Sequence, residues 1–351
     1  MAISMIKYGL VCLLLLFFLP PTYTLAQKKP AGKLAPKPLY RDPIYDGAAD
    51  PVIIWNKREK KWFMFYTNRR ATDPAAEGVT WVHGTRIGIA ESADGGATWS
   101  YRDTANINYR PTPQYTHWAS DVVEDAKGRY HMFLTYVPGI FTDWNHPRHI
   151  LHLTSSDLLN WKYESTLNLT TDKVIDASVF RRPDGTWRMW YNNERDGKSI
   201  YYADSPDLYH WQDKGLALKE RGEGPKVFRW NDRYWMIIDK WKGLGVYSSA
   251  DLQQWQPQEE RLVELPGKGP EDQAIGGHPD VVVQGDRAYL FYFTHPGRTE
   301  GTPSAAATIA TKRSLIQVVE LHYANGKLTC DRDQPTYIQL KPTGKQPKKP
   351  L

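Results

Sequence analysis

The feature that most constrains the fold is a unit that recurs five times along the chain. Each unit starts with an unusual residue placed directly before a short apolar strand, and a turn and a second, aromatic-rich strand follow. The five leading residues, called heads below, are Asp50, Trp118, Asp176, Glu223 and His278. Five units with four short strands each predict an all-β, five-bladed β-propeller that forms a single domain.

The endings of the units support this interpretation. Three of them carry an Asp-x-x-x-Trp pattern preceded by serine, which ends at Trp161, Trp211 and Trp255. This pattern predicts a tight turn into the outermost strand, with each tryptophan packed between neighbouring blades. The fifth unit diverges. We expect its third strand at residues 307–310. We also expect the ring to close through a strand from one end of the chain, Thr336–Leu340, that pairs with a blade formed by the other end.

The chain ends differ from the repeats in composition. Lys7 precedes an apolar run, Tyr8–Leu19, and Ala26 ends a short segment before polar residues, which predicts a secretory signal peptide over residues 1–26. The run is too short to span a membrane. We therefore expect an exported protein, periplasmic or extracellular, with a linker over 27–38, the propeller over 39–340 and a basic tail over 341–351. Without the signal only Cys330 remains, so no intramolecular disulfide is expected.

The net charge of +6 does not indicate a nucleic-acid-binding face. Residues 1–38 and 341–351 hold nine lysines and no acidic residue, so residues 39–340 carry 36 basic and 39 acidic residues, a net charge of −3. The predicted domain is therefore slightly acidic, which does not favour nucleic acid as a partner. The 14 tryptophans and 21 tyrosines of the whole chain have two interpretations: aromatic filling of a β-rich core, and in addition stacking platforms for sugar rings.

The first strand of each propeller blade lines the central axis, so the five heads are expected to meet at one mouth of the ring. Hydrolysis of a glycosidic bond needs one carboxyl group to protonate the leaving oxygen and another to activate water. Facing blades can hold two such groups roughly 6.5–9.5 Å apart, the range associated with inversion. Glu223 is the better candidate for the acid, because a carboxyl in a cleft near other carboxylates can have a raised pKa.

The heads and their neighbours resemble a known family. The motifs Ala49-Asp50-Pro51, Trp118-Ala-Ser-Asp121, Asp176-Ala-Ser-Val-Phe180, Gly222-Glu223-Gly-Pro225 and Gly277-His278 are similar, in order and position, to those of family 43 glycoside hydrolases and their clan relatives, which include the anhydrogalactosidase family. The resemblance covers roughly residues 45–295. It implies that Asp50 is the general base, that Asp176 positions and tunes the acid, and that Glu223 is the general acid. It also implies a calcium ion on the axis near His278.

The sequence departs from this family where the substrate would be chosen. Trp118-Ala-Ser replaces the more usual Trp-Ala-Pro, and a long insertion, Arg69–Thr85, is expected to overhang the site. Lys226 is expected to be a solvated strand residue. The predicted contacts to an oligosaccharide or polysaccharide substrate are Trp118, Asp121, Trp81, His83 and Arg69.

The resemblance implies cleavage of terminal bonds in plant or algal polysaccharide fragments, with an arabinofuranoside or xyloside as the default sugar. Two alternatives stay open. One is a related propeller that acts as a retaining fructosidase or transglycosidase. The other is a carbohydrate-binding propeller without catalytic activity, although a protein that only binds sugar has no need of all three acids.

Overall fold

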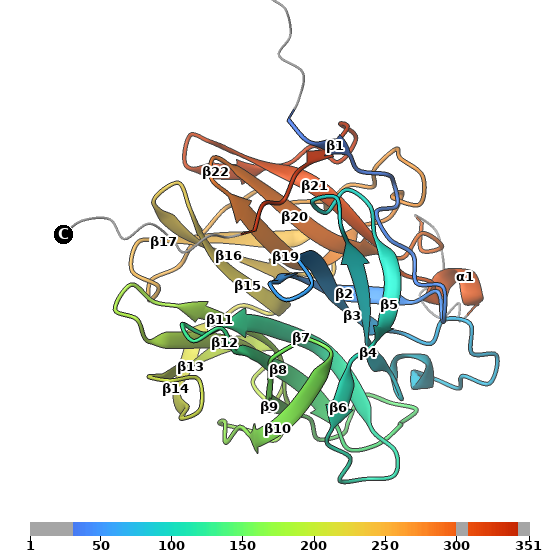
Figure 1. The fold of residues 1–351 in the computed structure, drawn as a ribbon, viewed down its shortest axis with the longest axis vertical. Helices are drawn as coiled ribbons and strands as arrows, with labels where there is room; N and C mark the ends of the chain where they lie inside the picture. The colour runs from blue at the N-terminus through green and yellow to red at the C-terminus, as the bar shows by residue number, and fades with distance from the viewer. Residues whose placement is uncertain (1–30, 300–307, 343–351) are drawn as a thin grey trace, which may run out of the picture. The chain divides into compact units, whose positions relative to one another are not determined.

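The structure is a computed structural model, and it describes residues 31–299 and 308–342. The predicted signal peptide, residues 1–26, and most of the predicted basic tail lie outside these residues. The described part is built almost entirely of strands, which form five consecutive antiparallel sheets (Figure 1). The predicted five-bladed β-propeller is confirmed.

Each blade is one continuous segment of the chain. Blade 1 contains β2 (Ala48–Asn56), β3 (Lys61–Asn68), β4 (Arg86–Ser92) and β5 (Ser100–Thr104). Blade 2 contains β7 (Thr116–Glu124), β8 (Tyr130–Val137), β9 (His149–Ser155) and β10 (Asn160–Thr166), and β6 (Asn106–Asn108) pairs in parallel with β10. Blade 3 contains β11 (Val174–Arg181), β12 (Trp187–Asn193), β13 (Ser199–Ser205) and β14 (Gln212–Leu218). Blade 4 contains β15 (Glu223–Trp230), β16 (Arg233–Asp239), β17 (Leu244–Ser249) and β18 (Gln256–Pro257). Blade 5 contains β19 (Gly276–Gln284), β20 (Arg287–Thr294), β21 (Leu315–Ala324) and β22 (Lys327–Thr329).

The inner strands β2, β7, β11, β15 and β19 form a closed ring, because each contacts the next and β19 contacts β2. Aromatic and aliphatic side chains fill the space between successive blades. In β3, Phe63 and Phe65 pack toward blade 2, whereas the alternating Trp62, Met64 and Tyr66 pack toward blade 5. This period of two explains why the second strands are apolar on both faces. The blades are therefore held together by apolar burial rather than by disulfides.

The tryptophans at the ends of the units lie between blades, as predicted. Trp161 packs edge-on against Phe65 of blade 1, and Trp211 packs the same way against Phe133 of blade 2. Trp255 lies against Trp190 of blade 3, with ring centroids 5.9 Å apart. The preceding serine and aspartate make the turn, since the Ser155 hydroxyl accepts from the backbone N–H of Leu158. The repeated motif is therefore a structural element of the blade interfaces.

The two chain ends differ from the expectation for them. Residues 33 and 34 form β1 (Lys33–Leu34), which pairs with β23 (Tyr337–Ile338), and Ala35 N–H donates to the Thr336 carbonyl. The predicted linker is therefore hydrogen-bonded to residues 336–338 at its described end, where residues 31–34 are exposed and Ala35 is buried. Residues 336–340 do join the two chain ends, but they add no strand to a blade. No helix among residues 31–299 and 308–342 is long and apolar enough to cross a membrane.

The third strand of blade 5 was placed wrongly by the sequence pattern. It is β21, Leu315–Ala324, whereas residues 309–312 form the short helix α1 (Ile309–Lys312). Thr308 caps this helix by accepting from Thr311 N–H, which explains why a Thr-rich apolar run forms a helical turn here. The other described helical turn is η1 (Thr80–Val82), in the insertion of blade 1. Both turns lie beside the cavity described next.

Candidate active site

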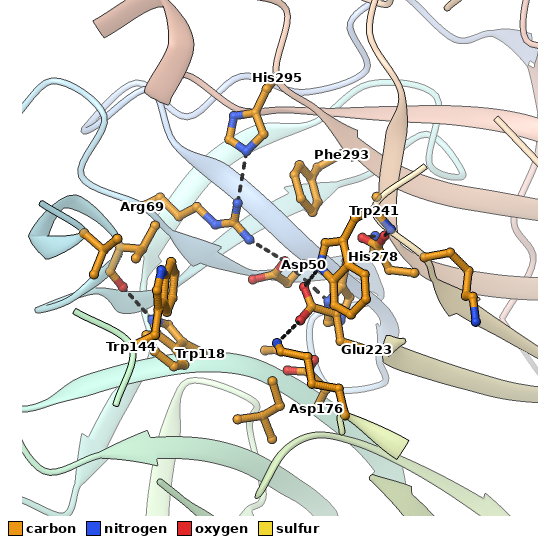
Figure 2. A pocket seen from close by; sticks show the side chains of 18 of the residues that line it. Asp50, Arg69, Trp118, Trp144, Asp176, Glu223, Trp241, His278, Phe293 and His295 are labelled. Atoms are coloured by element: carbon orange, nitrogen blue, oxygen red, sulfur yellow. Dashed lines mark hydrogen bonds and ion pairs between the residues drawn. The ribbon is translucent and has the colours of Figure 1, made fainter. Parts of the chain in front are cut away.

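A cavity of about 1430 Å³ opens where the inner strands begin, and all five heads line it. Its wall comes from two kinds of segment. The first is the start of each inner strand, and the second is the loop that joins the second and third strands of each blade. These loops contribute, from blade 1 to blade 5, Trp81, Trp144, Lys198, Trp241 and Arg298. Figure 2 shows Asp50, Glu223 and His278 close together, with Asp176 below Glu223 and Trp118 beside Trp144.

Three of the heads sit in strained backbone positions. The pairing of the inner strand with its neighbour shifts register at the start of every blade, and Asp50, Asp176 and His278 occupy this bulge with φ of 54°, 59° and 41°. Such positions cost roughly 1–3 kcal/mol each and concentrate at functional sites. Neighbouring blades hold two of these bulges, since Asp176 N–H donates to Thr135 Oγ1 (3.0 Å) and His278 N–H donates to Asp239 Oδ2 (2.8 Å).

The other two heads are not equivalent to these three. In blades 2 and 4 the bulge is occupied by Ala119 and Gly224, so Trp118 and Glu223 stand one residue earlier. Gly224 has a φ of 56°, and a Cβ on it would lie 2.8 Å from the His278 ring. Close packing against His278 therefore requires a glycine at position 224. The packing of the bulge does not require a carboxylate at position 223.

Asp50 is held as a carboxylate. Its Oδ1 accepts from Arg69 Nη2 at 3.0 Å and lies 3.5 Å from His278 Nδ1. Burial alone would raise the pKa of Asp50, but the charges of Arg69 and His278, together with a hydrogen bond from Thr67, hold it below its ordinary value. An ionised carboxylate is the form that can take a proton from water.

Arg69 is itself fixed by His295, as Figure 2 shows. His295 Nδ1 donates to the Arg313 carbonyl at 2.7 Å, which leaves Nε2 as the acceptor for Arg69 Nη1 at 3.2 Å. Burial and the charges of Arg298 and Arg69 hold the pKa of His295 well below its ordinary value. A neutral imidazole therefore orients the guanidinium that faces Asp50.

Glu223 lies on the opposite side of the cavity from Arg69. Its Oε1 accepts from Trp241 Nε1 at 2.9 Å, its Oε2 accepts from Lys198 Nζ at 3.0 Å, and its side chain is 26% exposed. Asp176 is buried beside it and accepts from Gly224 N–H at 3.0 Å. Burial and the charges of Glu223 and Asp50 raise the pKa of Asp176 well above its ordinary value. The three acids therefore have three different environments.

The sequence did not reveal a fourth acid in the cavity, Asp239. It ends β16 directly opposite Glu223, and its oxygens accept from the backbone N–H groups of Trp241 (2.7 Å) and His278 (2.8 Å). Burial and the charge of Glu223 raise the pKa of Asp239 to about 7. A signal was present, since Asp239-Lys-Trp241 follows the second strand of the unit that contains Glu223.

The raised pKa of Asp239 predicts a pH-dependent stability. The folded protein keeps this proton up to about pH 7, whereas an unfolded aspartate loses it near pH 3.9. The stabilisation is therefore complete below about pH 4 and is lost as the pH rises toward 7. We expect the unfolding free energy of the wild type to fall relative to Asp239→Asn over this range, by about 1–4 kcal/mol. Urea unfolding of both proteins at several pH values measures this, and a constant difference between them would refute the assignment.

Tryptophans form much of the cavity wall. Trp118 is mostly buried, and Trp144, which is 52% exposed, lies with its ring centroid 6.1 Å from that of Trp118 (Figure 2). Trp81 of the insertion lines the cavity and meets His295 edge-on. The sequence analysis missed Trp144 and Trp241, which lie in loops between second and third strands. The predicted overhang of the insertion agrees with the structure.

Two of the predicted substrate contacts do not line the cavity. His83 is buried behind Trp118, with ring centroids 5.0 Å apart, and burial lowers the pKa of His83 to about 4. Asp121 is 2% exposed and lies deeper on the inner strands. It accepts from the backbone N–H of Val179 at 2.6 Å and from Lys226 Nζ at 3.0 Å. His83 therefore supports Trp118 by packing against it, and Asp121 links blade 2 to blades 3 and 4.

The residues on the axis do not fit a calcium site. Lys226, expected to be solvated, has a side chain that is only 18% exposed, and its ammonium group lies 3.0 Å from Asp121 and 2.7 Å from Asp280. The axis therefore already has a cation between its carboxylates, and the charges of both acids raise the pKa of Lys226 against the opposing effect of burial. Among the described residues, no three His, Cys, Asp or Glu side chains are grouped to hold a metal ion, and His278 lies against Asp50.

Comparison with known proteins agrees with this architecture. Residues 40–269 match the family described as "Probable glycosyl hydrolase domain", which is related to family 43. A thermostable family 43 glycoside hydrolase superimposes with a TM-score of 0.61 at 17% identity, over 87% of this chain and 100% of that one. A family 43 enzyme from Xanthomonas citri, solved with xylotriose, gives a TM-score of 0.58 at 14% identity over 81% and 90%.

A curated relative is named for a different substrate. A probable sucrose-6-phosphate hydrolase of Psychromonas ingrahamii is 28% identical over 152 residues, which is 37% of this chain. The match spans only 28% of the length of that relative. The structural neighbours show the fold, a five-bladed propeller like that of these family 43 enzymes. Because the family match covers more than half of the sequence, the chain belongs to this family of glycosyl hydrolase domains, which supports a glycosidase.

Proposed function

We propose that the chain is a glycoside hydrolase that cleaves terminal glycosidic bonds with inversion, with Glu223 as general acid and Asp50 as general base. The observation that carries this proposal is the contrast between the two carboxyl groups. Asp50 is held ionised by Arg69, whereas Glu223 is partly exposed in the same cavity beside Asp176, whose pKa is raised by burial and by the charge of Glu223. One acid and one base facing a single pocket are what this hydrolysis requires.

The arrangement of the blades favours inversion. Asp50 comes from blade 1 and Glu223 from blade 4, and blade 5 separates these two blades in the ring. Groups on blades that are not neighbours can face each other across the axis, and the proposal requires a carboxyl separation that leaves room for a water molecule beside the sugar. In the proposed mechanism Glu223 protonates the leaving oxygen while Asp50 takes a proton from the attacking water. Asp176 positions Glu223 and modulates its proton affinity.

The proposed substrates are oligosaccharides from plant or algal polysaccharides. A pocket lined by Trp118, Trp144 and Trp241 suits a terminal sugar, because aromatic faces pack against the apolar face of a pyranose or furanose ring. The default sugars are arabinofuranose and xylose, in keeping with the neighbour solved with xylotriose. The N-terminal sequence pattern, which lies outside the described residues, supports export to the periplasm or the cell exterior.

Product stereochemistry tests the mechanism. We expect ¹H NMR of hydrolysis in a panel of aryl glycosides and plant and algal oligosaccharides to show first the anomer opposite in configuration to the substrate. The sequence similarity to a sucrose-6-phosphate hydrolase favours one alternative, a retaining fructosidase, for which Asp50 would be a nucleophile. First appearance of the retained anomer would replace our mechanism by this alternative.

A further inference from the structure

The cavity carries far more positive charge than the domain around it. Ten lysines and arginines line it against five acidic residues, although residues 39–340 as a whole have a net charge of −3. The basic residues are Arg69, Arg148, Lys173, Lys198, Arg221, Lys240, Lys242, Arg261, Arg298 and Lys312. Catalysis on a neutral sugar explains at most the few that contact the acids. The remainder need another explanation.

Half of these cations are already paired with carboxylates. Arg69 is paired with Asp50, Arg148 and Lys198 with Glu194, Lys240 with Glu220, and Arg261 with Glu264. Over residues 31–299 and 308–342, the structure gives no acidic partner to Lys173, Arg221, Lys242, Arg298 or Lys312. Arg221 stacks on Trp241, and Lys242 is exposed. Two of these unpaired cations, Arg298 and Lys312, are grouped around His295, the residue that contacts Arg69.

Lys312 is the most informative of them. It ends α1, lines the cavity and is only 5% exposed, yet no described side chain accepts a hydrogen bond from its ammonium group. Because its ammonium nitrogen is not itself fully buried, the charge faces the cavity, and over the described residues no carboxylate neutralises it. Two guanidinium groups near Lys312 add to the excess of positive charge. Arg298 and Arg69 act together on His295, which contacts the backbone of residues 312 and 313.

The surroundings of this group suit a charged sugar. The Arg298 guanidinium donates to the Thr311 carbonyl at 2.8 Å and lies 5.6 Å from the centre of the Trp81 ring. Burial and the charge of Arg69 lower the pKa of Arg298 to about 10. An anion placed here would relieve repulsion between these cations while the sugar ring packs on Trp81.

We propose that Arg298 and Lys312 bind an anionic substituent, a carboxylate or a sulfate ester, on the sugar that Asp50 and Glu223 act upon. This inference rests on the proposed glycosidase function and names the substrate class of the same site. Guanidinium and ammonium groups form strong charge-assisted hydrogen bonds with both kinds of anion. The substrate is therefore a uronic acid or a sulfated sugar residue, in contrast to the neutral arabinose or xylose expected from the family alone.

Binding to a protein without turnover separates this inference from the catalytic one. We would use the full chain with Glu223→Gln and measure calorimetrically its affinity for matched pairs: glucuronate with glucose, galacturonate with galactose, and galactose 6-sulfate with galactose. The uronates and the sulfate distinguish the two kinds of anion. We expect one anionic member to bind at least about tenfold more tightly than its neutral partner, with a preference that weakens as salt is added.

Lys312→Met, made in the same background, should remove most of this preference, because methionine keeps the length of the side chain without its charge. Lys240→Met is the matched control, since Glu220 already neutralises Lys240 at 2.9 Å, and it should leave the anionic-to-neutral ratio unchanged. Arg298→Gln provides a second variant should Lys312→Met not fold. Equal binding of both members of each pair, or an unchanged ratio in both variants, would overturn the proposal. Binding of neither member would count against the glycosidase function as well.

Discussion

Glu223→Gln is expected to lose roughly 10²–10⁴-fold in kcat on substrates whose leaving group needs a proton, because glutamine cannot protonate the glycosidic oxygen. The loss should shrink to a small factor on dinitrophenyl glycosides, whose leaving group departs as a stable anion. Glutamine keeps the acceptor oxygen for Trp241 Nε1, whereas its amide nitrogen cannot accept from Lys198 Nζ, which keeps its ion pair with Glu194. Parallel kinetics on a series of aryl glycosides of increasing leaving-group pKa measures the effect.

Asp50→Asn supplies the contrast. A missing base impairs the attack of water whatever the leaving group, so we expect this variant to be slow across the whole series. The pair of results distinguishes the two roles, whereas a general loss of structure would make both variants slow on every substrate. A Glu223→Gln enzyme with the same loss on activated and unactivated substrates would contradict the acid role, and full activity in either variant would remove that residue from the mechanism.

The fold could be predicted because the sequence pattern of one blade recurs five times along the chain. Apolar positions of period two in the second strands, such as Phe63 and Met64, pack toward the two neighbouring blades, and the tryptophan at the end of each unit fills a blade interface. These patterns depend only on local sequence. The third strand of blade 5 was missed because its unit has no such ending, and a Thr-capped turn at 309–312 resembles a short strand in composition.

The candidate site could be predicted in part, for a geometric reason. The starts of the inner strands are marked by the repeat, so Asp50, Asp176 and Glu223 stand out in the sequence. The other half of the wall comes from loops between second and third strands, which vary in length and carry no repeat. Trp144 and Trp241 were missed in these loops, and Asp239 was missed at the end of the strand that leads into one of them. The topology nevertheless requires these loops to lie at the same end of the propeller as the heads.

The position of a side chain along an inner strand decides whether it meets substrate or the axis. The two predicted residues of blade 2, Trp118 and Asp121, illustrate this. Trp118 precedes the bulge and lines the cavity, whereas Asp121 follows the bulge and faces the axis. Lys226 likewise follows the bulge in blade 4, so its side chain points to the axis and contacts Asp121 and Asp280 instead of solvent. Sequence alone does not show the register shift that separates these positions.

Lys226→Met is expected to lower the free energy of unfolding by about 3–5 kcal/mol, because it leaves the carboxylates of Asp121 and Asp280 buried without their cation. Blades 2 and 4 are not neighbours in the ring, so the Lys226–Asp121 ion pair crosses its centre. Urea unfolding measures the loss. Lys61→Met is the matched control, since its pair with Glu91 at 2.8 Å is partly exposed and should contribute less than about 1 kcal/mol.

Two further comparisons show whether this lysine takes the place of a metal ion. The wild type should unfold at the same temperature with chelator, with added calcium and with neither, because the ammonium group already balances the two carboxylates. In Lys226→Met the same two carboxylates lack a cation, so calcium should raise the unfolding temperature. Replacing Asp121 and Asp280 by asparagine in that variant should recover part of the lost stability, since no buried charge then remains. A wild-type protein that releases a bound metal and loses stability on chelation would show that the ion pair does not replace the ion.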